Sequence, residues 1–379
     1  MTHSVIELTP EDAWQRQQSG AILLDVREEG ERAAGMAVGA VGVSQQTLQH
    51  TPANWLANCS TPVMLICAAG KRSHACGEAL IAQGYTRIFS VKGGTTAWQA
   101  AGLPMTAPAV DEDFLSRYSR HLRLPEVGLA GQRKLASAKV ALIGAGGLGS
   151  PAALYLAAAG IGTITLIDDD LVDRSNLQRQ VLHRNADIGT PKVESGRRTL
   201  HALNPSITVE PVRARLQADN VETLLAGHDV VIDGTDNFAT RYLVNDACAH
   251  LGLPMVYGAV QGFEGQVSVF WPGQPGGSCY RCLFPDPPPP EFAPNCAEAG
   301  VLGVLLGIIG LLQTAEAIKL LLGLGESLSG ILLQFDALSM RFNRIKLLRD
   351  PDCPTCGQGT QHHAYQDLPQ VCASDQMPR

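Results

Sequence analysis

The chain has 379 residues, which is long for one hydrophobic core and indicates two or three compact units. With 45% hydrophobic and 17% charged residues it has the composition of a folded globular protein, and its net charge of −7 argues against non-specific binding to nucleic acid or to an anionic membrane. The first residues, MTHSVIELTPEDAW, carry acids where a secretory signal has a basic and then an apolar run. The longest apolar stretch, residues 301–312, is too short to span a bilayer and predicts a buried core helix, so we expect a cytosolic protein.

The first 108 residues alternate short apolar strands with helical stretches. Ala21–Val26 and Pro62–Cys67 read as buried strands, because each is short, apolar and bounded by turn or charge signals. Ser73–Gly84 reads as a helix that ends at its glycine, and another strand follows near residues 87–91. We therefore predict an α/β domain at residues 1–108, followed by a linker at 109–116; the sequence around that boundary, APAVDEDFLS, has small and acidic residues and a proline.

A second α/β unit is predicted for residues 117–358. Strands alternate with helices, as in a Rossmann-like fold with a parallel sheet. The strands are predicted at 138–144, 163–168, 229–233, 254–260 and 265–271, and the helices at 148–160 and 238–251. The proline-rich run at 285–295 can only be a loop, because prolines remove backbone donors. The polar residues 359–379 are expected to form a flexible tail.

A glycine-rich turn, GAGGLG, follows the first strand of this second unit and opens a helix, and an acid stands 19 residues after its last glycine. Glycines let a backbone approach phosphate, a helix N-terminus offers N–H groups, and the acid hydrogen-bonds ribose hydroxyls. This context predicts a nucleotide site; the alternative is a turn needed only for close helix–strand packing. The residues expected to bind the nucleotide are Asp168 and the four glycines Gly144, Gly146, Gly147 and Gly149.

Two cations and an amide after the second strand suggest which nucleotide binds. Asn176, Arg179 and Lys192 suit a triphosphate that loses pyrophosphate, because fixed positive charge stabilises that transition state. Taken singly, each cation has the alternative of simple solvent exposure. Asp236, in the sequence DGTDN at a strand end, is a candidate ligand of Mg²⁺ bridging phosphates, with a helix N-cap as the other role.

The cysteines fall into two groups. Four of the ten form two CxxC pairs about 70 residues apart, a pattern typical of a closed structural zinc site. The alternative, a pair of disulfides, is disfavoured in a reducing cytosol. The predicted zinc ligands are Cys279, Cys282, Cys353 and Cys356.

Two further cysteines stand in loops that suggest chemistry. Cys67 ends a strand in CAAGKRS, where backbone N–H groups with Lys71 and Arg72 would lower the thiol pKa. Its alternative is a buried strand-end thiol. Cys296 precedes the apolar helix in CAEAGV, with a core thiol as its alternative.

Together, several motifs of residues 117–358 resemble the MoeB/ThiF family of adenylyltransferases. The motifs are RYSRHLRLPEVG, GAGGLGS, NLQRQVLH, GTPKVES, HDVVIDGTDN, CYRCLFP, CAEAGV and CPTCGQ. The resemblance implies that ATP adenylates the C-terminal glycine of a ubiquitin-like sulfur carrier. It assigns Asp236 to Mg²⁺ and adenylation, Asp168 to ribose, and Asn176, Arg179 and Lys192 to phosphates. It also implies the Cys₄ zinc, a transient sulfur linkage at Cys296, and a homodimer in which Arg120 reaches the ATP of the opposite subunit.

Residues 1–108 resemble a rhodanese domain through LLDVREEGERAAG, CAAGKRS and VKGGTTAWQAAGLP. The resemblance places Cys67 at the persulfide-forming position, with a cysteine desulfurase or thiosulfate as the sulfur donor. Two departures are visible. Met36–Val38 replaces the usual His-Ile-Pro segment, and alanines occupy the active loop where an arginine often stands, which puts donor specificity in doubt.

The two resemblances together predict an enzyme that activates a carrier and supplies its sulfur. The pattern NLQRQ, CYRCLF and EAGV leans towards the molybdopterin synthase small subunit as carrier, with the thiamine carrier or another as alternatives. A nicotinamide- or flavin-dependent oxidoreductase would explain the glycine turn alone. A non-enzymatic scaffold that binds a ubiquitin-like partner is also possible, although the intact Asp236, Arg179 and Lys192 argue against it.

Overall fold

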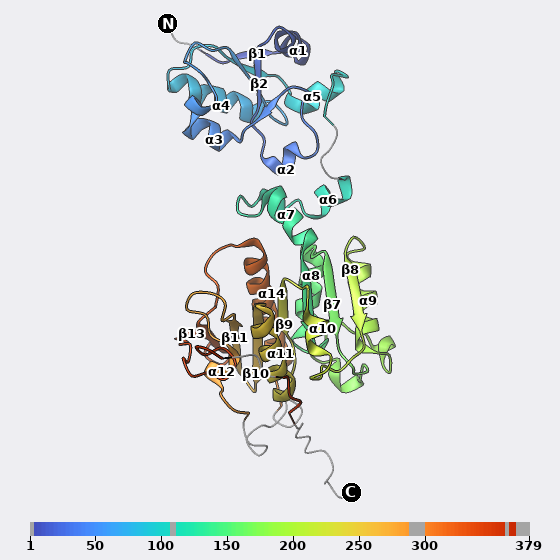
Figure 1. Ribbon diagram of the computed structural model, residues 1–379. Helices are drawn as coiled ribbons and strands as arrows, with labels where there is room; N and C mark the ends of the chain where they lie inside the picture. Colours follow the sequence, from blue (N-terminus) through green and yellow to red (C-terminus); the bar gives the residue numbers. More distant parts are fainter. Residues whose placement is uncertain (1–3, 107–110, 288–299, 361–363, 369–379) are drawn as a thin grey trace, which may run out of the picture. The chain divides into compact units, whose positions relative to one another are not determined.

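The computed structural model describes residues 4–106, 111–287, 300–360 and 364–368. The chain divides into two compact units, residues 1–132 and 133–379 (Figure 1). Cys296, one of the residues predicted to act in sulfur transfer, lies outside the described residues, as does most of the proline-rich run before it.

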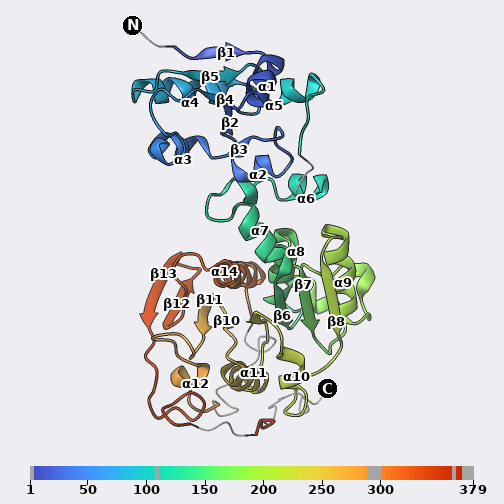
Figure 2. The same ribbon diagram turned by 45° about the horizontal axis from the view of Figure 1, so that its top comes forward.

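The N-terminal unit is built on a five-stranded parallel sheet with the order β1-β5-β4-β2-β3 (Figure 2). Alternate side chains of the central strands supply two separate cores. Leu23, Met64 and Ile66 face one side, and Leu24 and Leu65 face the other. The strands are β1 (Ile6–Leu8), β2 (Ile22–Asp25), β3 (Val41–Gly42), β4 (Val63–Ile66) and β5 (Ile88–Val91).

Helices cover both faces of this sheet. Helices α1 (Pro10–Gln18) and α5 (Gly94–Ala100) pack on one face through Ala13 and Trp98, and helices α3 (Gln45–His50) and α4 (Lys71–Ala82) pack on the other. The Trp98 side chain is fully buried, meets Trp14 edge to face at 5.9 Å, and donates its indole N–H to the Pro104 carbonyl at 3.2 Å. The α/β domain predicted from the sequence is therefore present.

A small helical segment completes the N-terminal unit. Helix α6 (Glu112–Arg117) begins where the Asp111 carboxylate accepts the Phe114 N–H at 2.7 Å, so most of the segment expected as a linker is helical. Helix α2 (Glu29–Arg32) lies beside this segment, and Ala33, Tyr118 and Leu122 share one apolar cluster. Helix α7 (Gly128–Ser137) runs across the boundary between the two units.

The second unit contains an eight-stranded mixed sheet with the order β13-β12-β11-β10-β9-β6-β7-β8. Its strands pair in parallel from β10 to β8, whereas β10, β11, β12 and β13 pair antiparallel. The antiparallel half extends the parallel sheet predicted from the sequence. The strands are β6 (Lys139–Ile143), β7 (Thr163–Ile167), β8 (Thr208–Val212), β9 (Val230–Asp233), β10 (Met255–Gln261), β11 (Glu264–Phe270), β12 (Ile331–Asp336) and β13 (Arg341–Lys346).

Helices again form a layer on each side of the sheet, around two large apolar clusters. The first cluster involves α8 (Gly149–Ala159), α9 (Lys192–Leu203) and α14 (Gly303–Leu322). The second involves α10 (Val221–Leu225), α11 (Phe238–Leu251) and α12 (Tyr280–Leu283). Strands β6 and β9 are neighbours, and the chain leaves β6 toward β7 but leaves β9 toward β10, in the opposite direction along the sheet. Open α/β sheets bind ligands at such a switch point, outside the carboxyl ends of the strands.

Helix α14 is the one helix of the described residues that is long and apolar enough to cross a membrane. It packs against α8, β10 and β11, and its Leu305, Ile309 and Ala317 side chains are completely buried. Such burial is typical of the core helix that the sequence predicted. The helix, Gly303–Leu322, is longer than the apolar run at residues 301–312 from which it was predicted.

Residues 364–368, which fall in the expected tail, pack against the second unit. The Tyr365 hydroxyl donates to Glu222 at 2.9 Å, and the Asp367 carboxylate accepts the Ala218 N–H at 2.9 Å. Leu368 adds an apolar contact to the cluster that contains α10 and α11. This short stretch therefore has fixed partners.

A buried ion pair joins the end of β9 to helix α11. The Arg241 Nε donates to Asp233 Oδ2 at 2.9 Å, and its Nη2 donates to the Thr235 carbonyl at 2.9 Å. The other oxygen of Asp233 accepts the N–H and hydroxyl of Thr235 at 3.0 and 2.6 Å. Both charged side chains are less than a tenth exposed. The network fixes the loop that connects β9 to α11.

We expect Arg241→Met to lower the free energy of unfolding by about 3–5 kcal/mol, because it leaves the buried Asp233 carboxylate without a counter-charge. The matched control is Arg197→Met, whose ion pair with Glu194 is exposed and should contribute about 0–1 kcal/mol. Urea unfolding of the full chain measures both. Equal midpoints for the two variants would contradict the role given to this pair.

Candidate nucleotide and sulfur-transfer sites

The glycine turn at the end of β6 is a close approach of two backbone segments. Gly144 has a φ of +86°, and a Cβ built there would lie 2.8 Å from the Gly234 carbonyl oxygen. A Cβ on Gly149 would lie 1.8 Å from the Gly144 oxygen. Only glycine fits at either position, and the turn is thereby pressed against the loop that follows β9.

Asp168, at the end of β7, lies against this turn as the sequence predicted. Its Oδ2 accepts the Ala145 N–H at 2.8 Å, and its Oδ1 accepts the Asp170 N–H at 2.8 Å. Burial raises the pKa of Asp168, although Lys192 and the two backbone donors act in the opposite direction. The carboxylate therefore ties the glycine turn to the neighbouring strand.

Lys192 is brought into the same site at the start of α9. Its side chain is buried, with Nζ 2.6 Å from Asp170 Oδ2 and 4.0 Å from Asp168 Oδ2. Asp168, Asp169 and Asp170 bring three carboxylates within 4.8 Å of one another. Lys192 partly balances that negative charge, and a phosphate that enters must compete with Asp170 for its ammonium group.

Arg179 and Asn176 lie in the loop between β7 and α9. The Arg179 guanidinium is half-buried, donates to the Ser175 carbonyl at 3.1 Å, and has no carboxylate partner among the described residues. The Asn176 amide faces the Ser175 hydroxyl at 3.4 Å. A Cβ on Gly146 would lie 3.7 Å from the amide of Gln180, the residue after Arg179, so this loop borders the glycine turn.

Asp236 is exposed in the loop between β9 and α11. The N-cap of α11 is Asn237, whose side chain accepts the Thr240 N–H at 2.9 Å. The N-cap role that the sequence left open for Asp236 therefore belongs to Asn237. Among the described residues the Asp236 carboxylate has no hydrogen bond or ion pair. It is therefore available to a ligand at the switch-point edge of the sheet, where the loop is fixed by Gly234 and the Asp233 network.

Two buried polar residues that the sequence analysis did not single out complete this region. His183 contacts the Ala145 carbonyl through Nε2 at 2.9 Å and the Ser195 hydroxyl through Nδ1 at 3.0 Å. Gln313, on α14, donates to the Asp233 carbonyl at 2.6 Å and the Val256 carbonyl at 3.0 Å. The signal available in the sequence was a glutamine within an apolar helix and a histidine that ends the motif NLQRQVLH.

Arg120 belongs to the N-terminal unit, where it is exposed at the start of a short 3₁₀ turn, His121–Arg123. Its expected reach to the ATP of a second subunit stays a prediction, as does the role of Cys296.

The four cysteines of the two CxxC pairs come together in the second unit. The sulfur–sulfur distances are 3.9 Å for Cys279–Cys282, 3.5 Å for Cys279–Cys353 and 3.4 Å for Cys282–Cys356. A tetrahedron with Zn–S bonds of about 2.3 Å has edges of about 3.8 Å, so four thiolates at these spacings fit one zinc ion and leave no open position. The cluster ties the chain after β13 to α12, which contains Cys282 and has Cys279 as its N-cap.

The predicted sulfur site lies at the carboxyl end of β4. The Cys67 thiol accepts the Gly70 N–H at 3.1 Å and the Ser73 hydroxyl at 3.4 Å, and Ser73 also contacts Ser90 at 2.8 Å. Burial alone would raise the pKa of Cys67, but the Ser73 hydroxyl and the loop amides outweigh it and lower the pKa. The loop therefore favours a thiolate, the form that attacks sulfur donors.

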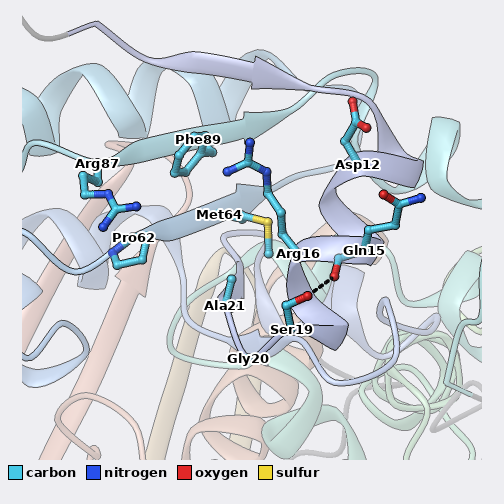
Figure 3. A pocket seen from close by; sticks show the side chains of 10 residues that line it. All are labelled: Asp12, Gln15, Arg16, Ser19, Gly20, Ala21, Pro62, Met64, Arg87 and Phe89. Atoms are coloured by element: carbon cyan, nitrogen blue, oxygen red, sulfur yellow. Dashed lines mark hydrogen bonds between the residues drawn. The ribbon is translucent and has the colours of Figure 1, made fainter.

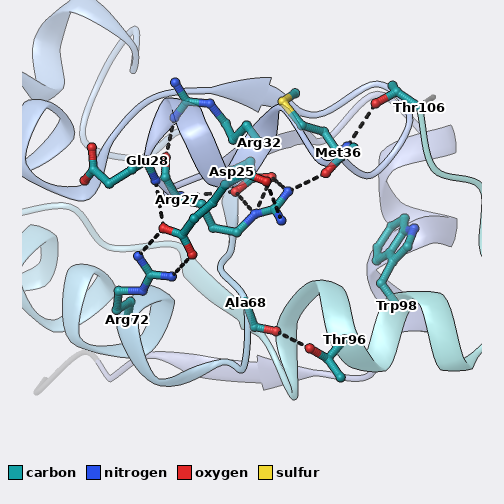
Figure 4. Close-up of polar contacts among 12 residues, drawn as sticks. Asp25, Arg27, Glu28, Arg32, Met36, Ala68, Arg72, Thr96, Trp98 and Thr106 are labelled. Atoms are coloured by element: carbon teal, nitrogen blue, oxygen red, sulfur yellow. Dashed lines mark hydrogen bonds and ion pairs between the residues drawn. The ribbon is translucent and has the colours of Figure 1, made fainter. Parts of the chain in front are cut away.

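The backbone of this loop is held by the N-terminal segment of α5. Thr95 donates its N–H to the Cys67 carbonyl at 2.7 Å. Thr96 donates its hydroxyl to the Ala68 carbonyl at 2.9 Å, as Figure 4 shows. A Cβ on Gly94 would lie 2.0 Å from the Cys67 oxygen, so this close approach requires glycine at position 94.

The two cations expected to support the thiolate contribute less than the loop amides. The Arg72 guanidinium forms a fork with the Glu31 carboxylate at 2.8 and 2.5 Å (Figure 4). The positive charge of Arg72 is therefore largely neutralised by Glu31 and does little to stabilise the Cys67 thiolate. Lys71 is exposed at the first position of α4. The pKa of Cys67 is accordingly lowered chiefly by hydrogen bonds.

A separate open pocket of about 700 Å³ lies at the amino ends of β4 and β5 (Figure 3). Its walls include Arg87 and Arg16, whose guanidinium stands 4.8 Å above the Phe89 ring. Cys67 follows the opposite end of β4, so this pocket is distinct from the predicted sulfur site.

Comparison with known proteins finds a family match for each of the two units. Residues 118–355 match the ThiF family, and residues 9–101 match the rhodanese-like domain. The SAMP-activating enzyme E1 of Haloferax volcanii is 52% identical over 251 residues, 66% of this chain and 92% of that protein. The sulfur carrier protein adenylyltransferase of Thermus thermophilus is 48% identical over 264 residues, 69% of this chain and 97% of that protein.

A third relative is the adenylyltransferase and sulfurtransferase MOCS3 of Sus scrofa, which is 49% identical over 267 residues; the match covers 70% of this chain and 58% of the relative. Among solved structures, E. coli MccB has a TM-score of 0.56 at 22% identity, over 70% of this chain and 81% of that one, which supports the fold alone. The chain belongs to the ThiF family and carries a rhodanese-like domain in addition. It is an enzyme of the adenylyltransferase and sulfurtransferase class, as the sequence predicted.

We expect Ser73→Ala to shift the alkylation of Cys67 by iodoacetamide to higher pH. The Ser73 hydroxyl stabilises the thiolate, so its loss raises the pKa of Cys67 and leaves less thiolate at a given pH. Peptide mass spectrometry follows Cys67 apart from the exposed Cys59, and Ser60→Ala serves as a surface control. An unchanged pH profile in Ser73→Ala would show that the hydroxyl does not support the thiolate.

We expect the full chain to carry about one zinc ion, and Cys353→Ser to lose it together with stability of the second unit. Elemental analysis measures the metal, and thermal unfolding measures the stability. The N-terminal unit should stay folded, and Cys59→Ser, outside the cluster, should keep the zinc. A wild-type chain without zinc would remove the assignment.

Proposed function

We propose that this enzyme uses ATP to adenylate the C-terminal glycine of a ubiquitin-like sulfur carrier, and that its rhodanese-like domain supplies the sulfur for a thiocarboxylate. The observation that carries the proposal is the glycine turn pressed against the loop of Asp236, with Asp168 and Lys192 beside it. The names of the Thermus and Haloferax relatives, which refer to a sulfur carrier and to SAMP activation, support the same reading.

Adenylation solves a chemical problem of the carrier's carboxylate. Its negative charge repels nucleophiles, and oxide is a poor leaving group. Attack of the carboxylate oxygen on the α-phosphorus of ATP expels pyrophosphate and gives an acyl adenylate, from which AMP leaves readily. In this proposal Gly144, Gly146, Gly147 and Gly149 let the backbone approach the phosphates, and Asp168 binds the ribose hydroxyls.

The charge that develops during this step needs fixed cations. Arg179 has no carboxylate partner among the described residues, and Lys192 is held near the glycine turn by Asp170. In this proposal both cations stabilise the phosphates, and Asn176 assists them. The exposed carboxylate of Asp236 would hold Mg²⁺, which prefers oxygen ligands and would neutralise phosphate charge when bound.

Sulfur transfer uses the other unit. The Cys67 thiolate attacks the outer sulfur of thiosulfate or of a persulfide on a cysteine desulfurase; the S–S bond breaks, sulfite or the desulfurase thiolate leaves, and Cys67 becomes a persulfide. The outer sulfur attacks the carbonyl carbon of the acyl adenylate, and AMP leaves. A second thiol then attacks the Cys67 sulfur, which releases the thiocarboxylate and leaves a disulfide. Cys296 is the candidate for that thiol, or for relaying the sulfur itself.

The remaining assignments concern the setting of the reaction. We place the enzyme in the cytoplasm as a homodimer in which Arg120 completes the ATP site of the partner subunit. The carrier that the motifs favour is the small subunit of molybdopterin synthase, with a thiamine-type or other carrier as the alternative.

A paired assay separates the two half-reactions. We expect Cys67→Ala to keep carrier-dependent exchange of pyrophosphate into ATP near the wild-type rate while losing most thiocarboxylate, since alanine cannot carry a persulfide. Asp236→Ala should form the Cys67 persulfide but no acyl adenylate, with exchange reduced about a hundredfold or more. Exchange is measured beside the mass of each candidate carrier.

Normal thiocarboxylate formation by Cys67→Ala from the same donor would remove the N-terminal unit as sulfur source. Undiminished exchange by Asp236→Ala would remove the proposed adenylation site.

A further inference from the structure

The residue after the first glycine of the turn is held at both of its backbone groups. The Ala145 N–H donates to Asp168 Oδ2 at 2.8 Å. Its carbonyl oxygen contacts His183 Nε2 at 2.9 Å and accepts the Ser150 hydroxyl at 3.3 Å. Ala145 itself is completely buried. Its carbonyl therefore points into the protein, toward the layer formed by His183 and helix α9.

The chemistry of His183 fixes which proton it carries. A carbonyl oxygen can only accept, so His183 Nε2 must bear the hydrogen at this contact. Its Nδ1 faces the Ser195 hydroxyl at 3.0 Å, which can donate to a neutral ring. Burial lowers the pKa of His183; the hydrogen bond to the Ala145 carbonyl and the charge of Asp187 act against this, Lys192 acts with it, and the pKa stays below its ordinary value. At neutral pH the ring is therefore an uncharged Nε2–H donor.

A peptide unit transmits this orientation to the next residue. In a trans peptide the C=O and the following N–H point in opposite directions. With the Ala145 carbonyl turned inward, the Gly146 N–H must point outward, to the crevice at the carboxyl ends of the strands. Among the described residues, the N–H groups of Gly146 and Gly147 have no protein acceptor, so they remain available to a ligand.

We propose that His183 is a positioning residue that holds the Ala145–Gly146 peptide so that the Gly146 N–H faces a phosphate of ATP. The inference rests on the proposed nucleotide site. If the peptide rotates, the Ala145 carbonyl oxygen turns toward the phosphate, and an attractive donor is replaced by a repulsive acceptor. Glycine at position 146 has no side chain to resist such a rotation, so the restraint must come from the Ala145 side.

The test compares two amides that each replace one ring nitrogen. In His183→Gln the side-chain N–H reaches the position of Nε2 and can donate to Ala145. In His183→Asn the shorter side chain reaches the position of Nδ1 near Ser195 and cannot contact Ala145. Calorimetric titration of the full chain with MgATP and, separately, with adenosine measures binding with and without phosphates.

We expect His183→Asn to bind MgATP about tenfold or more weakly, the usual effect of losing a hydrogen bond to a charged group, with adenosine binding within about twofold of wild type. His183→Gln should keep MgATP affinity within about threefold. Equal MgATP affinity in the two variants, or parallel loss of adenosine, would overturn the positioning role. A wild-type chain that binds adenosine but gains nothing from phosphates would instead overturn the proposed phosphate site.

Discussion

The close approach of the turn after β6 to the loop after β9 is the constraint on which the second unit depends. The separations that a Cβ would have at Gly144 and Gly149, 2.8 and 1.8 Å, leave no room for any other residue. The contact joins the glycine turn to the loop that carries Asp236, and Asp168 and His183 hold the turn through the backbone of Ala145. The Asp233–Arg241 ion pair and the hydrogen bond from Gln313 to the Asp233 carbonyl hold the start of the β9 loop in place.

The two units use backbone amides in related ways. In each, a parallel strand ends in a short loop followed by a helix, and the loop presents N–H groups to a negative charge. In the second unit the charge would be a phosphate; in the first it is the Cys67 thiolate, which accepts from Gly70. A second segment holds each loop from behind: His183 and Asp168 for the turn, and Thr95 for the cysteine loop. Preorganised N–H groups of this kind stabilise negative charge without reorganising during a reaction.

Features that depend on local pattern and spacing, such as helix ends and paired cysteines, could be predicted from the sequence. Helix α11 runs from Phe238 to Leu251 as expected, since its apolar periodicity has a cap at each end, and the two CxxC pairs announced their cluster. Tertiary context decided the rest. Helix α6 forms in the expected linker because Tyr118 and Leu122 beyond it find an apolar cluster. Arg72 pairs with Glu31, 41 positions away, and His183 contacts a carbonyl 38 positions away; neither partner is visible in a local motif.

The cysteines show why the thiol chemistry is confined to few positions. Cys76 and Cys248 are buried without a hydrogen-bonding loop, and burial raises the pKa of Cys76 to about 12 and that of Cys248 further. Four other thiols are spaced to bind a metal, which would occupy their lone pairs. The pKa of Cys67, by contrast, is lowered by its loop. Because Cys76 shares the cluster of Cys67 and its raised pKa keeps it protonated, a sulfur donor meets one thiolate in that core. Burial alone would keep both thiols protonated, and the hydrogen-bonding loop makes Cys67 the exception.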